Sequence, residues 1–148
     1  MLIPVLRKAP NVVRYLYRHF QIHSKTRQIL MDKLSKIESE FHILLPMVYK
    51  DFYDLCSFSI PDNLVGTDLI NNCSYSDLNE GAVELLKDDG IDNFIEGDDF
   101  IFMMHQGYMF WYFKANGDTD PIVYGYYQGK LKPDNFGRFS DFIKEYIK

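Results

Sequence analysis

Two histidines near the amino terminus have the spacing of metal ligands. His19 and His23 are four residues apart, which places both side chains on the same face of a helix. No third or fourth ligand of the usual kind accompanies them, and Arg18 and Lys25 carry charges that repel a cation. We therefore interpret the two histidines as a solvated or partly packed pair rather than as a metal site.

One further histidine and two cysteines are the candidates for acid–base or nucleophilic catalysis. His105 lies between two apolar runs, and no nucleophile motif such as Gly-x-Ser-x-Gly accompanies it. Cys56 and Cys73 stand alone rather than in a Cys-x-x-Cys pair, which indicates reduced, half-buried thiols of a cytoplasmic protein. We interpret His105 as a turn or contact residue, and we predict that the chain is not an enzyme.

The densest group of charges lies between positions 88 and 99. Its acidic residues do not follow the alternating ligand pattern of a calcium-binding loop, and Asp99 stands where such a loop needs glutamate. Two interpretations stay open: a solvated loop, or a surface that steers a basic partner. The six carboxylates, with no Lys or Arg between them, are Asp88, Asp89, Asp92, Glu96, Asp98 and Asp99.

The composition is that of one globular domain with an uneven charge distribution. The chain has 148 residues, 47% of them hydrophobic and 16% aromatic, and this length is enough for a single core. Residues 1–50 carry a net charge of +6 and residues 51–148 one of −11. The basic residues near the start could contact nucleic acid, but the acidic balance of the whole chain argues against it. These basic residues are Arg7, Lys8, Arg14, Arg18, Lys25 and Arg27.

Several signals that would place the chain in another class are missing from the sequence. We find no apolar run long enough to span a membrane, no secretory signal and no glycine-rich loop for a nucleotide. We therefore expect a cytoplasmic protein that has neither a cofactor nor a membrane partner.

The elements that must position these residues begin with helices. Apolar side chains recur at helical spacing in the first part of the chain, and Pro46 suits the first turn of a helix. In that helix the buried face is either Val48, Phe52 and Leu55 or Tyr49, Tyr53 and Cys56. The sequence predicts helices over residues 11–22, 25–41, 46–56 and 78–87, with a short strand near residues 64–70.

Strand patterns dominate the region that follows. Aromatic and β-branched residues predict strands over residues 100–105, 108–114 and 122–128, and Gly107 joins the first two as an antiparallel hairpin. Strict alternation predicts that Phe102 and Met104 share one face of the first strand. Both of its faces are apolar, so we expect a central strand that is covered on each side.

The chain ends in an amphipathic helix, for which Ser140 is a good amino-terminal cap. Helices, then strands, then a closing helix predict an α+β domain. We expect a twisted, mostly antiparallel or mixed sheet of about five or six strands, with helices packed around it.

Several short motifs follow one another in an order that carries a resemblance. The motifs are Leu45-Pro46, Tyr49-Lys50 with Phe52-Tyr53, the aromatic hairpin of residues 100–113, Asp120-Pro121-Ile122-Val123-Tyr124, and Phe139-Ser140-Asp141-Phe142-Ile143. In this order they resemble the SUKH superfamily, which includes the SMI–KNR regulators of fungal cell walls and many bacterial immunity proteins. The chain departs from the family at Cys56-Ser57-Phe58-Ser59, where a glycine pair is common.

The resemblance begins near residue 27 and continues to residue 148. It divides the chain into an amino-terminal helical extension, residues 1–24, and a SUKH-like domain, residues 25–148. It implies a non-enzymatic binding protein, because bacterial members mostly bind and neutralise a toxin, often a nuclease. We expect a monomer or a weak dimer that occludes its cognate toxin. The alternative that the family implies is a regulatory scaffold that recruits other protein partners.

Candidate contact residues for such a partner are the six carboxylates of residues 88–99 and any exposed tyrosines of the strands. We also expect that neutralising Asp88, Asp89, Asp98 and Asp99 together would slow association without lowering the melting temperature. The candidate tyrosines are Tyr108, Tyr124, Tyr126 and Tyr127.

Overall fold

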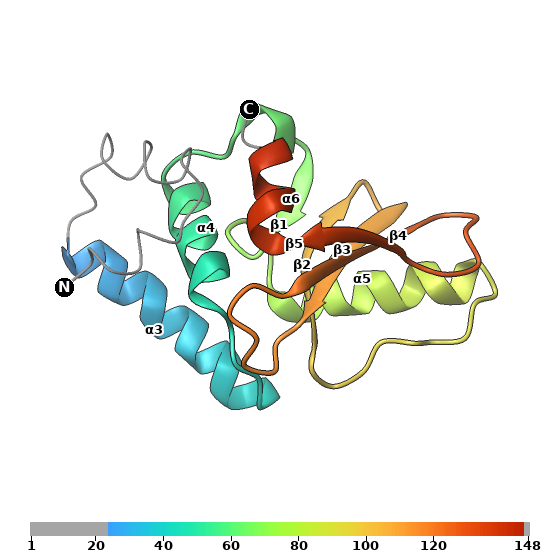
Figure 1. The fold of residues 1–148 in the computed structure, drawn as a ribbon, viewed down its shortest axis with the longest axis horizontal. Helices are drawn as coiled ribbons and strands as arrows, with labels where there is room; N and C mark the ends of the chain where they lie inside the picture. The colour runs from blue at the N-terminus through green and yellow to red at the C-terminus, as the bar shows by residue number, and fades with distance from the viewer. Residues whose placement is uncertain (1–23, 147–148) are drawn as a thin grey trace.

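A computed structural model describes residues 24–146, and these residues form an α+β domain (Figure 1). The predicted helix over residues 11–22, together with His19 and His23, lies outside the described residues. The elements are α3 (Ser24–Phe41), α4 (Met47–Phe58), a 3₁₀ turn (Asp62–Leu64), β1 (Thr67–Leu69), α5 (Tyr75–Asp88), β2 (Asp99–His105), β3 (Met109–Lys114), β4 (Ile122–Tyr127), β5 (Asp134–Arg138) and α6 (Phe139–Tyr146).

The five strands form one antiparallel sheet in the order β1-β2-β3-β4-β5, so each strand pairs with its neighbours in the sequence. The predicted number of strands and the predicted β2–β3 hairpin are confirmed. In the hairpin turn both Gln106 and Gly107 have positive φ, at 47° and 76°. Glycine relieves the strain at one of these two positions only.

A β-bulge in β2 decides which side chains share a face of the sheet. The register shifts between Ile101 and Met103, so Phe102 is the extra residue. Phe102 packs against Phe139 and Phe142, while Met104 lies beside Gly81 of α5. The prediction that Phe102 and Met104 share a face is therefore wrong, because strict alternation does not continue through a bulge.

Helices cover both faces of the central strands, as the two apolar faces of β2 predict. α4 and α6 lie on one side of the sheet, and α5 packs mainly against β2 on the other (Figure 1). Tyr49 of α4 is at the centre of the first layer, with ring contacts to Phe100 at 5.0 Å and to Phe113 at 5.6 Å. α4 buries both of the faces that the sequence left open, including Phe52, Tyr53 and Cys56.

The start of α6 differs from the prediction in one detail. Ser140 lies inside the helix rather than at its amino-terminal cap, because the helix begins at Phe139. The Asp120 carboxylate accepts hydrogen bonds from the Ser140 backbone N–H at 2.9 Å and from the Ser140 hydroxyl at 2.6 Å. A carboxylate from a distant loop thus satisfies the first turn in place of a local cap.

Candidate functional site

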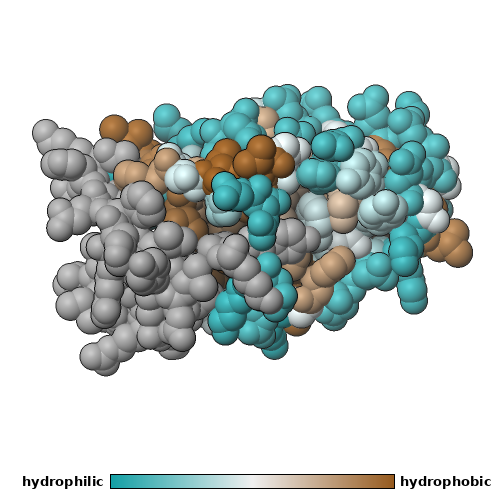
Figure 2. Space-filling view, turned by 90° about the horizontal axis from the view of Figure 1, so that it is seen from above, coloured by the Kyte–Doolittle hydropathy of each residue, from teal (hydrophilic) through white to brown (hydrophobic). Residues whose placement is uncertain are grey.

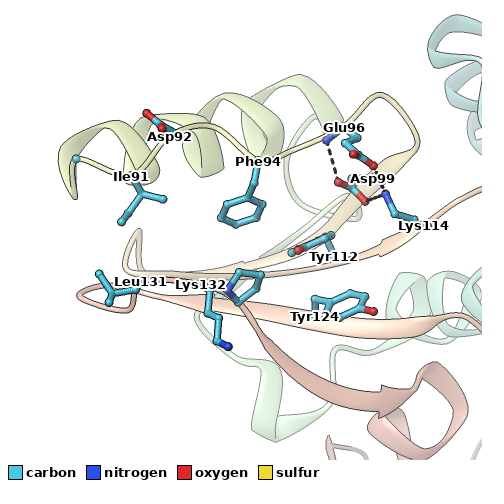
Figure 3. Close-up of a pocket in the computed structure, with 12 residues that line it drawn as sticks. Ile91, Asp92, Phe94, Glu96, Asp99, Tyr112, Lys114, Tyr124, Leu131 and Lys132 are labelled. Atoms are coloured by element: carbon cyan, nitrogen blue, oxygen red, sulfur yellow. Dashed lines mark hydrogen bonds and ion pairs between the residues drawn. The ribbon is translucent and has the colours of Figure 1, made fainter.

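The side of the sheet that faces α5 is only partly covered. α5 packs mainly on β2, and the part of this face formed by β3, β4 and the β4–β5 turn is hollowed (Figure 3). We call this hollow the sheet groove; its volume is about 690 Å³. Its lining residues are Gly90, Ile91, Asp92, Phe94, Glu96, Asp99, Tyr112, Lys114, Tyr124, Leu131, Lys132 and Pro133.

Aromatic rings form the floor of the sheet groove. Tyr112 and Tyr124 are paired across β3 and β4, and their rings stack with centroids 5.6 Å apart. Phe94 points from the loop before β2 toward the sheet, and its ring lies 6.0 Å from that of Tyr112 (Figure 3). Tyr112 is buried, whereas Phe94 and Tyr124 are half-buried and offer part of each ring to a ligand. Such faces bind apolar groups and cations.

One end of the groove holds a lysine among three carboxylates. The Lys114 ammonium lies 2.5 Å from Glu96, 3.2 Å from Asp98 and 3.0 Å from Asp99. Although burial acts to lower the pKa of Lys114, its hydrogen bonds with Glu96 and Asp99 outweigh this effect and hold the pKa above its ordinary value. Three carboxylates around one ammonium leave a surplus of negative charge at this end of the groove.

The buried member of this cluster is Asp99, whose side chain is 4% exposed. Besides its contact with Lys114, its carboxylate accepts a hydrogen bond from the Glu96 backbone N–H at 2.9 Å. Asp99 thereby fixes the end of the loop that carries Glu96. The contacts of Asp99 within the fold are therefore enough to explain an acidic residue at this position.

A second carboxylate fixes the other end of the same loop. One oxygen of Asp89 accepts hydrogen bonds from the Tyr126 hydroxyl at 2.6 Å and from the Gly129 N–H at 2.9 Å. These two bonds hold the pKa of Asp89 below its ordinary value, and burial followed by the hydrogen bond with Asp89 raises the pKa of Tyr126 to about 12. Asp89 thus connects the loop that follows α5 to the β4–β5 turn, and residues of this loop and of this turn line the groove.

The predicted contact residues separate into three sets. Asp92, Glu96, Asp99 and Tyr124 line the sheet groove, where Glu96 is exposed, Tyr124 is half-buried and Asp99 is buried. Tyr108 and Tyr127 lie together at the far end of the β2–β3 hairpin, with ring centroids 5.6 Å apart. The remaining candidates are the exposed Asp88, the half-exposed Asp98, and Asp89 and Tyr126, which hold the fold through their hydrogen bond.

Two of these placements correct the sequence predictions. Tyr126 is 0% exposed, so it is part of the core and cannot serve as an aromatic anchor on the surface. The structure also argues against the expectation that four aspartates can be neutralised without loss of stability. Asp89 and Asp99 each accept hydrogen bonds that fix the loop, so removing their charges would lower the melting temperature.

The sequence did not indicate the residues that form the aromatic floor and the apolar rim of the groove. Phe94, Tyr112 and Leu131 attracted no attention, because an aromatic or apolar residue in a sheet protein is most simply assigned to the core. Lys114 was the one that a pattern could have found. It ends the second strand of the predicted hairpin, close to the carboxylates that precede the first strand, and opposite charges often pair across strands.

The described residues contain little that suggests catalysis. The His105 Nδ1 lies 3.1 Å from the Thr67 hydroxyl, in contact with the neighbouring strand rather than with a nucleophile. Burial raises the pKa of Cys56 to about 12, and burial together with nearby carboxylates raises that of Cys73 to about 11. Both thiols are free, and Cys56 is fully buried rather than half-buried. Within residues 24–146, no His, Cys, Asp and Glu side chains cluster in a way that could hold a metal ion.

Two further observations bear on the class of protein. None of the helices in the part of the chain that the structure describes is both long and apolar enough to cross a membrane. Comparison of the chain with protein-family models, with curated proteins and with solved structures found no match. The groove and the motif order of the sequence are therefore the two features that bear on function.

Proposed function

We propose that this chain is a non-enzymatic binding protein that neutralises a protein toxin by covering it, and that the sheet groove is the binding surface. The observation that carries the proposal is the groove itself, with its aromatic floor, its charged end and its apolar rim. Interfaces between proteins combine these features, with aromatic anchors near the centre and polar groups around them.

The rim of the groove favours a protein over a small ligand. Leu131 stands at the tip of the β4–β5 turn and is 87% exposed, so a molecule enclosed in the hollow would leave it in water. A protein surface laid over the groove would cover Leu131 and Tyr124 together. On the face of the molecule shown in Figure 2, the right-hand end is mostly hydrophilic and carries only small apolar patches.

Two further considerations support a toxin as the partner. The motif order resembles the SUKH superfamily, whose bacterial members are mostly immunity proteins. The surplus of negative charge at the Lys114 end would also speed the approach of a basic protein such as a nuclease. Binding of this kind blocks a toxin by occlusion and needs no catalytic residue.

The test first identifies a toxin gene adjacent to the gene of this chain, and then expresses the toxic domain of that gene together with the chain. We expect restored growth of the host and a stable complex of the two purified proteins. The absence of both growth and a complex would contradict toxin neutralisation. So would a complex with an unrelated cellular protein if growth is not restored.

A matched pair of variants tests whether the groove is the surface involved. Leu131→Asp places a charge on the rim, and we expect it to weaken the complex by about thirtyfold, the effect of losing about 2 kcal/mol at an interface anchor. Val65→Asp makes the same change at a residue that is 69% exposed and does not line the groove, so affinity should not change. Equal affinities for the two variants would remove the groove from the proposal.

A further inference from the structure

We infer that the Lys114 end of the sheet groove takes an arginine side chain of the protein partner, stacked on Tyr124 and Phe94 and paired with Glu96. This inference rests on the proposed function and names the chemistry that the groove recognises. It follows from three properties of that end: its charge, its ring faces and the fixed position of its loop.

Among residues 24–146, which the structure describes, no further cation balances the charge at this end. Lys114 is the cation that Glu96, Asp98 and Asp99 share, and the side chain of Glu96 is still 69% exposed. Lys132 lies at the opposite end of the groove (Figure 3). Arg138, at the end of β5, pairs with the Asp118 carboxylate and donates a hydrogen bond to the Asp120 carbonyl. A second cation therefore completes the cluster, whereas an anion would be repelled.

The ring faces select the kind of cation. Phe94 projects from the loop above the sheet, Tyr112 and Tyr124 lie below it, and Glu96 stands at the same end (Figure 3). A planar guanidinium can stack on an aromatic face and still donate hydrogen bonds to a carboxylate in its own plane. A lysine ammonium is not planar and is more strongly hydrated, so it stacks less well on a ring, and Lys114 already occupies the position that suits it.

The loop that presents Glu96 is held in place before any partner binds. Asp99 accepts the hydrogen bond of the Glu96 N–H, and Asp89 holds the other end of the loop against the β4–β5 turn. A binding group that is already fixed loses less conformational entropy when it engages its ligand. The aspartates that stabilise the fold thus prepare the surface for recognition.

The test uses the full chain and a probe that carries only the recognised group. N-acetyl-arginine amide is added to isotope-labelled protein while the backbone amide and Tyr124 ring signals are followed by NMR. N-acetyl-citrulline amide serves as the control, because it has the same shape without the charge. We expect saturable shifts around Phe94, Glu96 and Tyr124 with arginine only. Equal shifts with citrulline, or shifts spread over all acidic surfaces, would overturn the inference.

Two variants, each with a matched control, locate the contact. Glu96→Gln and Tyr124→Leu should each raise the dissociation constant of the arginine probe about threefold, as expected for one ion pair or one cation–ring contact near a surface. Glu84→Gln on α5 makes the same charge change outside the groove, and Tyr127→Leu makes the same ring change on the same strand. If the controls weaken binding as much as the groove variants, the site is not in the groove.

This experiment separates the inference from the proposed function. It needs no partner protein, so probe binding without toxin rescue contradicts only the proposed function. Toxin rescue without probe binding contradicts only the arginine site.

Discussion

The glycine at position 125 should be among the least replaceable residues of the sheet, and the reason is space rather than backbone angle. Gly125 of β4 pairs with Trp111 of β3, and its φ is not in the positive range that favours glycine. A Cβ added there would lie 2.5 Å from Phe136 Cε2, 2.9 Å from Trp111 Cδ1 and 3.0 Å from Trp111 Nε1. Carbon atoms pack at about 3.5 to 4.0 Å, so Gly125→Ala forces both rings to move.

The two rings differ in how easily they can move. Trp111 is 4% exposed and is held within the core, whereas Phe136 is 42% exposed and can turn outward. Turning it outward gives up its edge contact with Phe142, whose ring centroid is 6.0 Å away. Overpacking of this kind costs about 1 to 3 kcal/mol, and we expect about 2 kcal/mol for Gly125→Ala. In a domain of this size the melting temperature should fall by about 4 to 8 °C.

The assay is urea unfolding followed by far-ultraviolet circular dichroism, since the substitution touches the only tryptophan and alters its fluorescence. Gly97→Ala is the matched control, because no atom lies within 4 Å of its added Cβ and its φ is not positive. That control should stay within about 0.5 kcal/mol of the parent. A Gly125→Ala protein as stable as the Gly97→Ala protein would refute the reasoning.

A second variant shows how much of the cost comes from Phe136. If the Phe136 ring carries part of the clash, the effect of Gly125→Ala should be smaller by at least about 0.5 kcal/mol in a Phe136→Ala background. An unchanged effect would assign the whole penalty to Trp111.

Two further outcomes follow from shifted pKa values. Burial raises the pKa of Asp54 to about 6, although the nearby Arg27 acts to lower it. In the unfolded chain the pKa of this carboxyl is 3.8, so between these two pH values Asp54 is protonated in the folded state and ionised in the unfolded state. The free energy of unfolding should therefore gain a contribution as the pH falls from about 6 to about 4, and Asp54→Asn should remove that contribution from the stability curve. The opposite slope in the difference between the two proteins would contradict this sign. Burial also raises the thiol pKa of Cys56 to about 12 and that of Cys73 to about 11, so neither should react quickly with a disulfide reagent at pH 8 in folded protein, although both should react in urea. A thiol that reacts as fast in folded protein as in urea would contradict its burial.

The elements that the sequence predicted correctly are those with a strong local signal. The strands around Gly107 combine aromatic runs with a turn residue, and the helix of residues 24–41 has a regular apolar period, so local pattern was enough. β5 was missed because its residues, Asp134 to Arg138, contain neither alternation nor β-branched side chains. An edge strand needs little local preference, since its partner β4 supplies the pairing.

The groove was harder to predict, because its contacts are non-local. Counting residue by residue from the pair His105–Met109 places Asp99 opposite Ala115, but the bulge at Phe102 moves it opposite Lys114. That one-residue shift forms the carboxylate–lysine cluster. The bond between Asp89 and Tyr126 joins residues 37 apart in sequence, and neither residue carries a local signal of the other.

The acidic segment shows why a charge count alone was a poor guide to its role. Asp89 and Asp99 hold the two ends of the loop, while Asp92 and Glu96 between them face solvent. Asp89 and Asp99 thus hold the loop in its conformation, whereas Asp92 and Glu96 give it a negative electrostatic potential that attracts a basic partner. A change to all of the carboxylates would alter shape and charge together, so a slower association could not be assigned to either. Changing the Asp92 and Glu96 side chains alone keeps the hydrogen bonds that Asp89 and Asp99 accept at the two ends of the loop, and a loss of association rate then reports the charge.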